Sequence, residues 1–176
     1  MAKVVIIPPE EEPFPKDRLG TWLFTLLVLH TLGNLDLLHL PLTGLFCSRK
    51  CPGETILKAC DQACGLREKE APVIGGFHTP VGKDMLEILL KGKGPVVICP
   101  ARGLEGMRIP KAWIRTIEQG RLLLASILDQ QVNRVTKETA YQRNVLVAAL
   151  ASKRVFIHVE LSGETEKMAM RFGLNE

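Results

Sequence analysis

The sequence predicts an α/β protein with a Rossmann-like, doubly wound and mainly parallel sheet that has helices on both faces. From about residue 42, short runs rich in Val, Ile and Leu alternate with helix-like segments, as in a parallel sheet buried on both faces. Small residues, hydroxyl groups and arginines follow most of these runs, and ligands bind at the carboxyl ends of strands in such sheets. With 176 residues and 46% hydrophobic content, the chain is long enough for one such core.

The first 32 residues are predicted to be an N-terminal arm and helix, followed by a Rossmann-like domain over residues 33–176. Residues 4–7 are apolar, but prolines and an acidic triplet follow, which indicates an arm or linker. A helix is predicted from about Lys16 to Leu32, ending at Gly33-Asn34, a common C-terminal signal. Its apolar part, residues 21–32, is too short to span a bilayer, so we interpret it as a buried helix and expect no membrane partner.

The rest of the chain is predicted to alternate between strands and helices after a connector with local helical character at residues 35–40. The strand-like runs are residues 42–47, 72–75, 95–99, 122–127 and 154–159. The helix-like runs are residues 53–69, 82–91, 110–119, 137–152 and 164–172. Right-handed crossovers between parallel strands then give the doubly wound topology.

The net charge and the cysteine content exclude few classes of function. The net charge of +4 permits nucleic-acid binding without demanding it. Four of the five cysteines form two C-x3-C pairs, whereas zinc ligands usually come in C-x2-C pairs. We therefore favour reduced, largely buried cysteines over a metal site, and the odd count with no signal peptide favours a cytoplasmic location.

Two of the strand-ending turns carry the first group of candidate residues. Ser48, Arg49 and Lys50 offer a hydroxyl, a guanidinium and backbone N–H groups just before a helix, which suits a phosphate. The alternative for this turn is a helix start with solvated charges. Gly75-Gly76 permits close backbone approach, and His78 beside it is placed to contact phosphate; the alternative is a tight turn before a proline.

Later segments add a second group of candidates. Lys83 lies near a helix start, and Arg102 lies in a glycine-containing loop that is either a mobile flap or a surface connection. Arg143-Asn144 is placed to aim donors at phosphate or base edges, the alternative being plain solvent exposure. The last loop offers hydroxyls and N–H groups at a helix start. The predicted nucleic-acid or phosphate-binding residues are thus Ser48, Arg49, Lys50, Gly75, Gly76, His78, Lys83, Arg102, Arg143, Asn144, Ser162, Gly163 and Thr165.

Catalytic signatures are missing from the sequence. It has no G-x-S-x-G nucleophile elbow, no Walker A motif and no H-E-x-x-H zinc motif. The four histidines are scattered and suggest neither a triad nor a metal cluster. We therefore predict no catalytic residues, no metal and no cofactor, and favour a binding protein over an enzyme.

Taken in order, these loops resemble those of the DNA-processing protein A (DprA/Smf) family, a Rossmann-like branch of the superfamily that includes the LOG nucleotide hydrolases. Ser48-Arg49 resembles the family's Gly-Ser-Arg turn, and Gly75-Gly76 resembles its Ser-Gly turn. Arg143-Asn144 resembles its Arg-Asn pair, and residues 149–160 resemble the segment that follows it. Residues 162–165 resemble its Ser-Gly-x-Thr turn, and the whole resemblance covers residues 33–172.

Members of that family bind single-stranded DNA and help to load a recombinase during DNA uptake. The resemblance therefore implies single-stranded DNA as the ligand and a recombinase as a protein partner. Binding would rest on phosphate and base contacts in a basic groove, without turnover. Family members often pair through sheet edges or helices, so a homodimer is a further expectation.

Two other interpretations stay open. The first is a LOG-like nucleotide-binding protein, either a nucleoside monophosphate hydrolase or a nucleotide sensor. LOG hydrolases carry Pro-Gly-Gly-x-Gly-Thr-x-x-Glu, and when Thr165 is placed on the motif's Thr, the catalytic Glu falls on Met168. This weakens the hydrolase interpretation and leaves nucleotide binding open. The second is a structural or interaction protein that has kept the fold and lost the site.

Overall fold

The computed structural model describes residues 3–8, 28–161 and 163–173, and within them seven strands form one sheet. The strands are β1 (Val5–Ile7), β2 (Leu29–Gly33), β3 (Thr43–Cys47), β4 (Val73–Gly75), β5 (Val96–Ile98), β6 (Leu122–Ser126) and β7 (Lys153–His158). The helices are the 3-10 helix η1 (Leu35–His39) and the α-helices α2 (Gly53–Glu68), α3 (Pro80–Leu90), α4 (Lys111–Glu118), α5 (Lys137–Leu150) and α6 (Glu164–Phe172).

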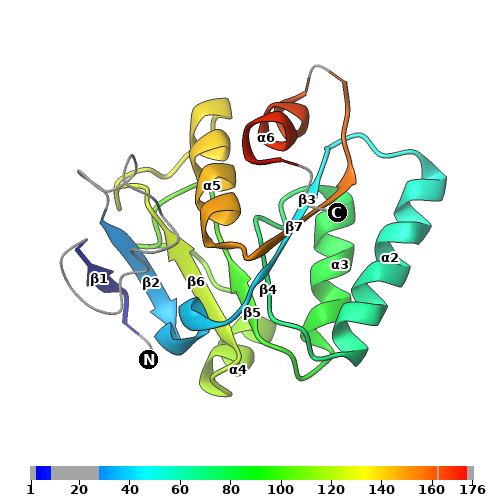
Figure 1. The fold of residues 1–176 in the computed structure, drawn as a ribbon. Helices are drawn as coiled ribbons and strands as arrows, with labels where there is room; N and C mark the ends of the chain where they lie inside the picture. The colour runs from blue at the N-terminus through cyan, green and yellow to red at the C-terminus, as the bar shows by residue number, and fades with distance from the viewer. Residues whose placement is uncertain (1–2, 9–27, 162, 174–176) are drawn as a thin grey trace.

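The strand order β1-β2-β6-β5-β4-β3-β7 produces a reversal of winding at β3 (Figure 1). From β3 to β6 the chain steps one strand at a time in one direction, and each step is a parallel pairing. After β6 the chain crosses back through α5 and places β7 parallel to β3 on its other side. Such a reversal opens a crevice at the carboxyl ends of the strands, here between β3 and its two neighbours.

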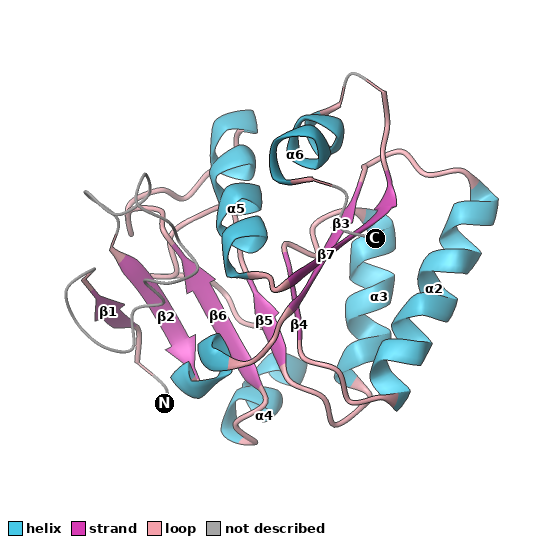
Figure 2. Ribbon diagram, in the orientation of Figure 1, coloured by secondary structure: helices cyan, strands magenta, loops and turns pink. Residues whose placement is uncertain are grey.

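Both faces of the sheet are covered by helices (Figure 2). Residues that alternate along each strand pack on opposite faces, as the two-residue period of a strand requires. The face covered by α5, α6 and η1 buries Leu29, Phe46, Ile74, Val97 and Leu123. The face covered by α2, α3 and α4 buries Leu32, Leu45, Val73, Val96 and Leu122. The predicted fold class, a doubly wound and mainly parallel α/β sheet, is confirmed.

The predicted strands and helices between residues 35 and 172 are all present, with ends that shift by only one or two residues in most cases. Their signals were strong because most of the strands are short, largely buried apolar runs and each helix follows a turn. The sequence signals at the N-terminal side were weaker, and there the structure differs from the prediction.

The predicted helix over residues 16–32 is wrong in its last turn, since Leu29–Gly33 forms β2, antiparallel to β6; residues 16–27 lie outside the described residues. Leu29 and Leu32 pack on opposite faces of the sheet, so each face of β2 buries one leucine. A strand buried on both faces and a buried helix give the same continuous apolar run, which periodicity alone does not separate.

The apolar run at residues 4–7 is also not an arm, because Val5–Ile7 forms the edge strand β1, antiparallel to β2. Ile7 is buried, whereas Val5 and Ile6 are exposed. The sheet thus contains strands from both sides of the division predicted at residue 32. The division itself stays a prediction.

The cysteines are free thiols, but only Cys99 is fully buried, and the other four are half-buried. In the described part of the chain, no group of three or more His, Cys, Asp or Glu side chains is arranged to hold a metal. Within the same residues, no helix has the length and apolar character needed to cross a membrane.

Candidate nucleic-acid interface

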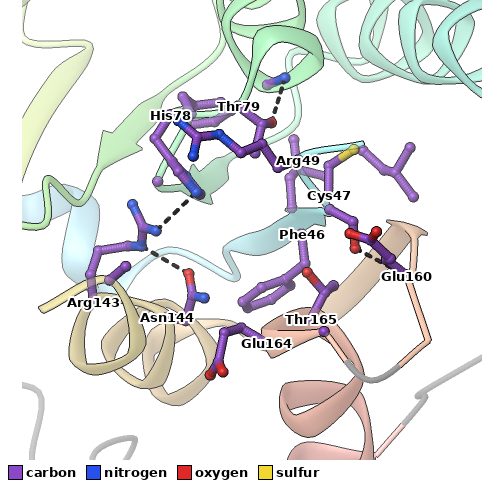
Figure 3. A pocket seen from close by; sticks show the side chains of 18 of the residues that line it. Phe46, Cys47, Arg49, His78, Thr79, Arg143, Asn144, Glu160, Glu164 and Thr165 are labelled. Atoms are coloured by element: carbon purple, nitrogen blue, oxygen red, sulfur yellow. Dashed lines mark hydrogen bonds between the residues drawn. The ribbon is translucent and has the colours of Figure 1, made fainter. Parts of the chain in front are cut away.

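A pocket of about 380 Å³ lies at the carboxyl ends of β3, β4 and β7, where the winding of the sheet reverses (Figure 3). We call it the Arg143 pocket after the residue at the centre of the contacts described below. Its walls come from the turn after β3, the turn after β4 with the start of α3, one side of α5, and the loop from β7 into α6. Its polar lining residues are Ser48, Arg49, His78, Thr79, Lys137, Arg143, Asn144, Glu160, Glu164 and Thr165.

The turn after β3 is fixed to the loop after β7 through Ser48. The N–H of Ser48 donates to the carbonyl of His158 over 3.0 Å, and its Oγ accepts from the N–H of Glu160 over 2.9 Å. The Ser48 side chain is buried, while Arg49 next to it is exposed and lines the pocket. Ser48 therefore positions the turn, and Arg49 is the residue free to reach a ligand.

The turn after β4 brings backbone close to the pocket without filling it. Phe77 has a positive φ of 45°, which turns the chain sharply, and its ring lies over Gly75. A Cβ atom at Gly76 would lie 2.2 Å from Nη1 of Arg143, so only glycine leaves room for the guanidinium there. Thr79 caps α3 by accepting from the N–H of Gly82 over 3.1 Å, and both residues line the pocket.

Arg143 of α5 is the main charge of the pocket, and only 1% of the residue is exposed. Its Nε donates to Oδ1 of Asn144 over 2.8 Å, and its Nη2 lies 3.4 Å from Nε2 of His78 (Figure 3). Among the residues that the structure describes, no carboxylate forms an ion pair with it. Burial lowers the pKa of Arg143 to about 10, which leaves the guanidinium charged at neutral pH.

His78 is a neutral partner of this cation. Its pKa is lowered to about 4, first by burial and then by the charges of Arg143, Arg49 and Lys83. A guanidinium can only donate hydrogen bonds, so the uncharged His78 ring accepts from Arg143 at Nε2. His78 therefore orients the guanidinium and adds no positive charge of its own near neutral pH.

Two carboxylates line the other side of the pocket, on the loop from β7 into α6. Glu164 pairs with Lys167 one turn further along α6, over 2.7 Å. Glu160 contributes its backbone N–H to the bond with Ser48. The pocket is thus lined by two arginines, which suit phosphate, and by two glutamates, of which Glu164 is already paired with Lys167.

The structure brings most of the predicted residues into this one pocket: Ser48, Arg49, Gly76, His78, Arg143, Asn144, Gly163 and Thr165. Gly75 lies within β4 beneath the ring of Phe77, and Lys50 and Lys83 lie outside the lining. Ser162 lies outside the described residues.

Arg102 is not part of the pocket. It donates to Oδ1 of Asn133 over 3.1 Å and to the carbonyl of Gly103, so it fastens the loop after β5 to the loop after β6. These bonds agree with the surface connection, and the mobile flap stays a prediction.

Sequence reasoning missed four polar lining residues: Thr79, Lys137, Glu160 and Glu164. Thr79 had a usable signal, because Thr before Pro is a common helix start. Lys137 follows the N-cap of α5, Thr136, which forms a capping box with Thr139. The sequence holds no signal that this start of α5 faces the pocket, because the direction of a helix over a sheet is set by the tertiary fold.

Residues 6–170 match the family described as DNA recombination-mediator protein A. The chain belongs to this family. The match begins within β1, so the family's pattern extends further toward the N-terminus than the resemblance seen in the loops. A comparison with curated proteins finds no significant match.

Two solved structures share the fold. DNA processing protein A (DprA) from Streptococcus pneumoniae is 21% identical with a TM-score of 0.75, and the match covers 98% of this chain and 61% of that one. DNA processing protein A from Helicobacter pylori, whose structure concerns its single-stranded DNA binding mode, is 19% identical with a TM-score of 0.72. That match covers 98% of this chain and 77% of the Helicobacter pylori chain.

Proposed function

We propose that this family member binds single-stranded DNA without turnover, and that the Arg143 pocket holds a backbone phosphate. The observation that carries the proposal is the buried Arg143 guanidinium with no carboxylate partner among the described residues. A buried charge is costly unless it is paired. A phosphate is the anion that an arginine at a sheet's carboxyl edge is suited to bind.

The surroundings of Arg143 support a phosphate in particular. Arg49 supplies a second, exposed guanidinium from the turn after β3, and Gly163 and Thr165 lie at the start of α6, where N–H groups point outward. Helix starts and arginines together favour anions. Contacts of this kind hold the backbone and carry little sequence information, which agrees with a protein that binds single strands of any sequence. The DNA-binding relative from Helicobacter pylori supports the same ligand.

A free nucleotide is the second candidate ligand, because a pocket of about 380 Å³ falls within the size range of small-molecule sites. The hydrolase version of this candidate is weaker. Met168, which takes the place of the catalytic Glu when the two motifs are aligned, is fully buried in the core. It supplies neither a carboxylate nor contact with the pocket.

Fluorescence anisotropy with a labelled single-stranded oligonucleotide tests the proposal in Arg49→Ala, Arg143→Met and the double variant. Methionine fills the space of the buried arginine without its charge. Each substitution should weaken binding about tenfold to a hundredfold, since hydrogen bonds to charged groups contribute about 1.5–3 kcal/mol. The slope of log affinity against log salt should flatten by about 0.7 for each phosphate that the protein no longer neutralises.

Arg115→Ala is the matched control, because Arg115 is an exposed arginine on α4 and does not line the pocket. Its affinity should stay within about twofold of the parent protein at each salt concentration. Full affinity in a folded double variant would refute the proposal. Binding of AMP in place of single strands would favour the nucleotide candidate.

A further inference from the structure

Two cysteines flank the turn that carries Arg49. Cys47 ends β3 and lines the pocket, and Cys51 lies just before α2. Their sulfur atoms are 3.2 Å apart, and both residues are half-buried. A disulfide needs an S–S distance of about 2.05 Å, so a shift of about 1 Å would bring the two sulfurs into bonding distance.

We propose that Cys47 and Cys51 form a modification site, in which oxidation by a peroxide joins them in a disulfide that closes the Ser48–Lys50 turn into a small ring. The ring would change the position of Arg49 and so weaken the site. The effect on DNA rests on the proposed function, whereas formation of the disulfide does not.

The chemistry needs only the two thiols and one peroxide molecule. Burial, together with the hydrogen bond to Cys51, raises the pKa of Cys47 to about 12, so the Cys47 thiol stays protonated near neutral pH. We therefore expect the Cys51 sulfur to attack hydrogen peroxide, which gives a sulfenic acid and one water. The Cys47 sulfur then attacks the Cys51 sulfur, the S–O bond breaks, and a second water leaves with the thiol proton. Two thiols and H₂O₂ become one disulfide and two waters.

The anchoring of the turn explains why this bond would move Arg49. Ser48 is held on the β7 side by its N–H and its Oγ. The thiol of Cys51 lies 3.7 Å from the carbonyl of Ser48. When the sulfurs close, the displacement falls on residues 49–51, since Ser48 is fixed. Arg49 then changes its position relative to Arg143, the other arginine that lines the pocket (Figure 3).

Peptide mapping tests the disulfide directly on the full chain. Trypsin cuts after Arg49 and Lys50, so the two cysteines fall in different peptides. After peroxide treatment and alkylation, the peptide of residues 51–58 should remain joined to the peptide that ends at Arg49, and a reductant should separate them. Loss of this joined species is expected in Cys51→Ser and not in Cys60→Ser. Absence of the joined species in the parent protein would overturn the proposal.

Two readouts then test whether the ring alters the turn. Cleavage of the native protein after Arg49 should slow about tenfold on oxidation, because a protease needs an extended, mobile segment that a small ring cannot supply. Affinity for single-stranded DNA should fall at least fivefold on oxidation, about 1 kcal/mol at RT of about 0.59 kcal/mol. Neither change should occur in Cys51→Ser, whose residue 51 lies outside the pocket lining.

A disulfide that leaves both the cleavage rate and the DNA affinity unchanged would overturn the proposed control. If neither redox form binds DNA, the proposed function fails, and the cleavage rate still decides whether the disulfide closes the turn.

Discussion

At the residue scale, the site depends on how burial sets the charge of neighbouring side chains. Arg143 stays charged although it is buried, and His78 beside it stays neutral. The neutral ring can accept a hydrogen bond from the guanidinium. A protonated His78 would lose that acceptor and place a second positive charge beside the first.

Protonation of His78 should make the protein less stable in mild acid. Its pKa is about 4 in the folded protein against an ordinary value of 6.5. Between those two values the unfolded chain takes up a proton that the folded protein does not, so the contribution of His78 to stability is present above 6.5 and is lost as the pH falls toward 4. Urea unfolding should show that the free energy of unfolding falls more between about pH 7 and about pH 4.5 in the parent protein than in His78→Gln.

Glutamine keeps an acceptor for Arg143 but does not titrate, which makes it the suitable comparison. The difference should be smaller than a fully buried histidine would give, because His78 is only partly buried and solvent reaches the rest of it and screens its charge. An equal fall in the free energy of unfolding in the parent protein and in His78→Gln would contradict the prediction.

The types of the site residues were predictable at this scale, but their environments were not. Arg, Ser and Gly at strand ends indicated phosphate chemistry, and that placed Arg49 and Arg143 among the candidates. Solvent exposure was the alternative for Arg143, yet it is buried. No local pattern indicates this burial, because it comes from Gly76, a residue on a different element that is distant in sequence.

At the element scale, the pocket depends on how closely α5 approaches the turn after β4. The guanidinium of Arg143 occupies the space that a side chain at residue 76 would need. Nothing else about this turn demands glycine at residue 76, since the positive φ belongs to Phe77. Glycine is therefore required at residue 76 because of the contact between α5 and the turn after β4.

Gly76→Ala should displace Arg143 and weaken binding of single-stranded DNA about tenfold or more, as expected when a guanidinium no longer reaches a charged group. Overpacking should also lower the free energy of unfolding by about 1–3 kcal/mol. Anisotropy and urea unfolding measure the two effects.

Gly65→Ala is the matched control, since a Cβ at Gly65 on α2 meets no atom within 4 Å. There alanine should stabilise the helix by up to about 1 kcal/mol and leave affinity unchanged. Unchanged DNA affinity in Gly76→Ala would contradict the prediction, because it would show that the Arg143 guanidinium moves aside and still binds.

Most elements could be predicted because each strand-like or helix-like run has a clear local pattern, and that pattern agrees with the alternation of strands and helices on either side of it. Residues 5–7 and 29–33 were the exceptions. Residues 29–33 were misjudged because an apolar run next to Gly33-Asn34 looks like a helix end. What makes it a strand is the free edge of β6, with which Thr31 pairs at Ala125. An unpaired sheet edge is a property of the tertiary structure, and a local sequence pattern does not indicate it.

At the scale of the whole molecule, the sheet joins the two ends of the described chain into one structure. β1 lies at one edge and β7 at the other, and the core on one face includes Ile7, Leu29 and Met168. The N-terminal strand therefore packs in the same core as the helix that borders the pocket.

Ile7→Ala should destabilise the entire protein by about 2–5 kcal/mol, the usual cost of emptying a buried aliphatic site. Only 2% of Ile7 is exposed. Circular dichroism and tryptophan fluorescence should follow one shifted unfolding transition. A transition of the remaining chain that stays in place would instead support a separate unit over residues 1–32.

Ile6→Ala provides the control, because Ile6 is the next residue on the same strand and is 56% exposed. Its effect should stay within about 0.5 kcal/mol, as for most surface substitutions. The homodimer, the recombinase partner and the cytoplasmic location also concern the whole molecule, and they stay predictions.

The burial of Arg143 has opposite consequences for the proposed DNA binding and for the stability of the protein. Within the described part of the chain the buried Arg143 guanidinium has no carboxylate partner, which makes the ligand-free fold less stable than one with an apolar residue at position 143. Selection for stability alone would replace this arginine, whereas the proposed DNA binding would keep it. A laboratory search for heat-resistant variants should therefore accumulate substitutions at residue 143, and a search that also demands DNA binding should not. The same residue would mark, in related chains, which copies have kept the activity and which have kept only the fold.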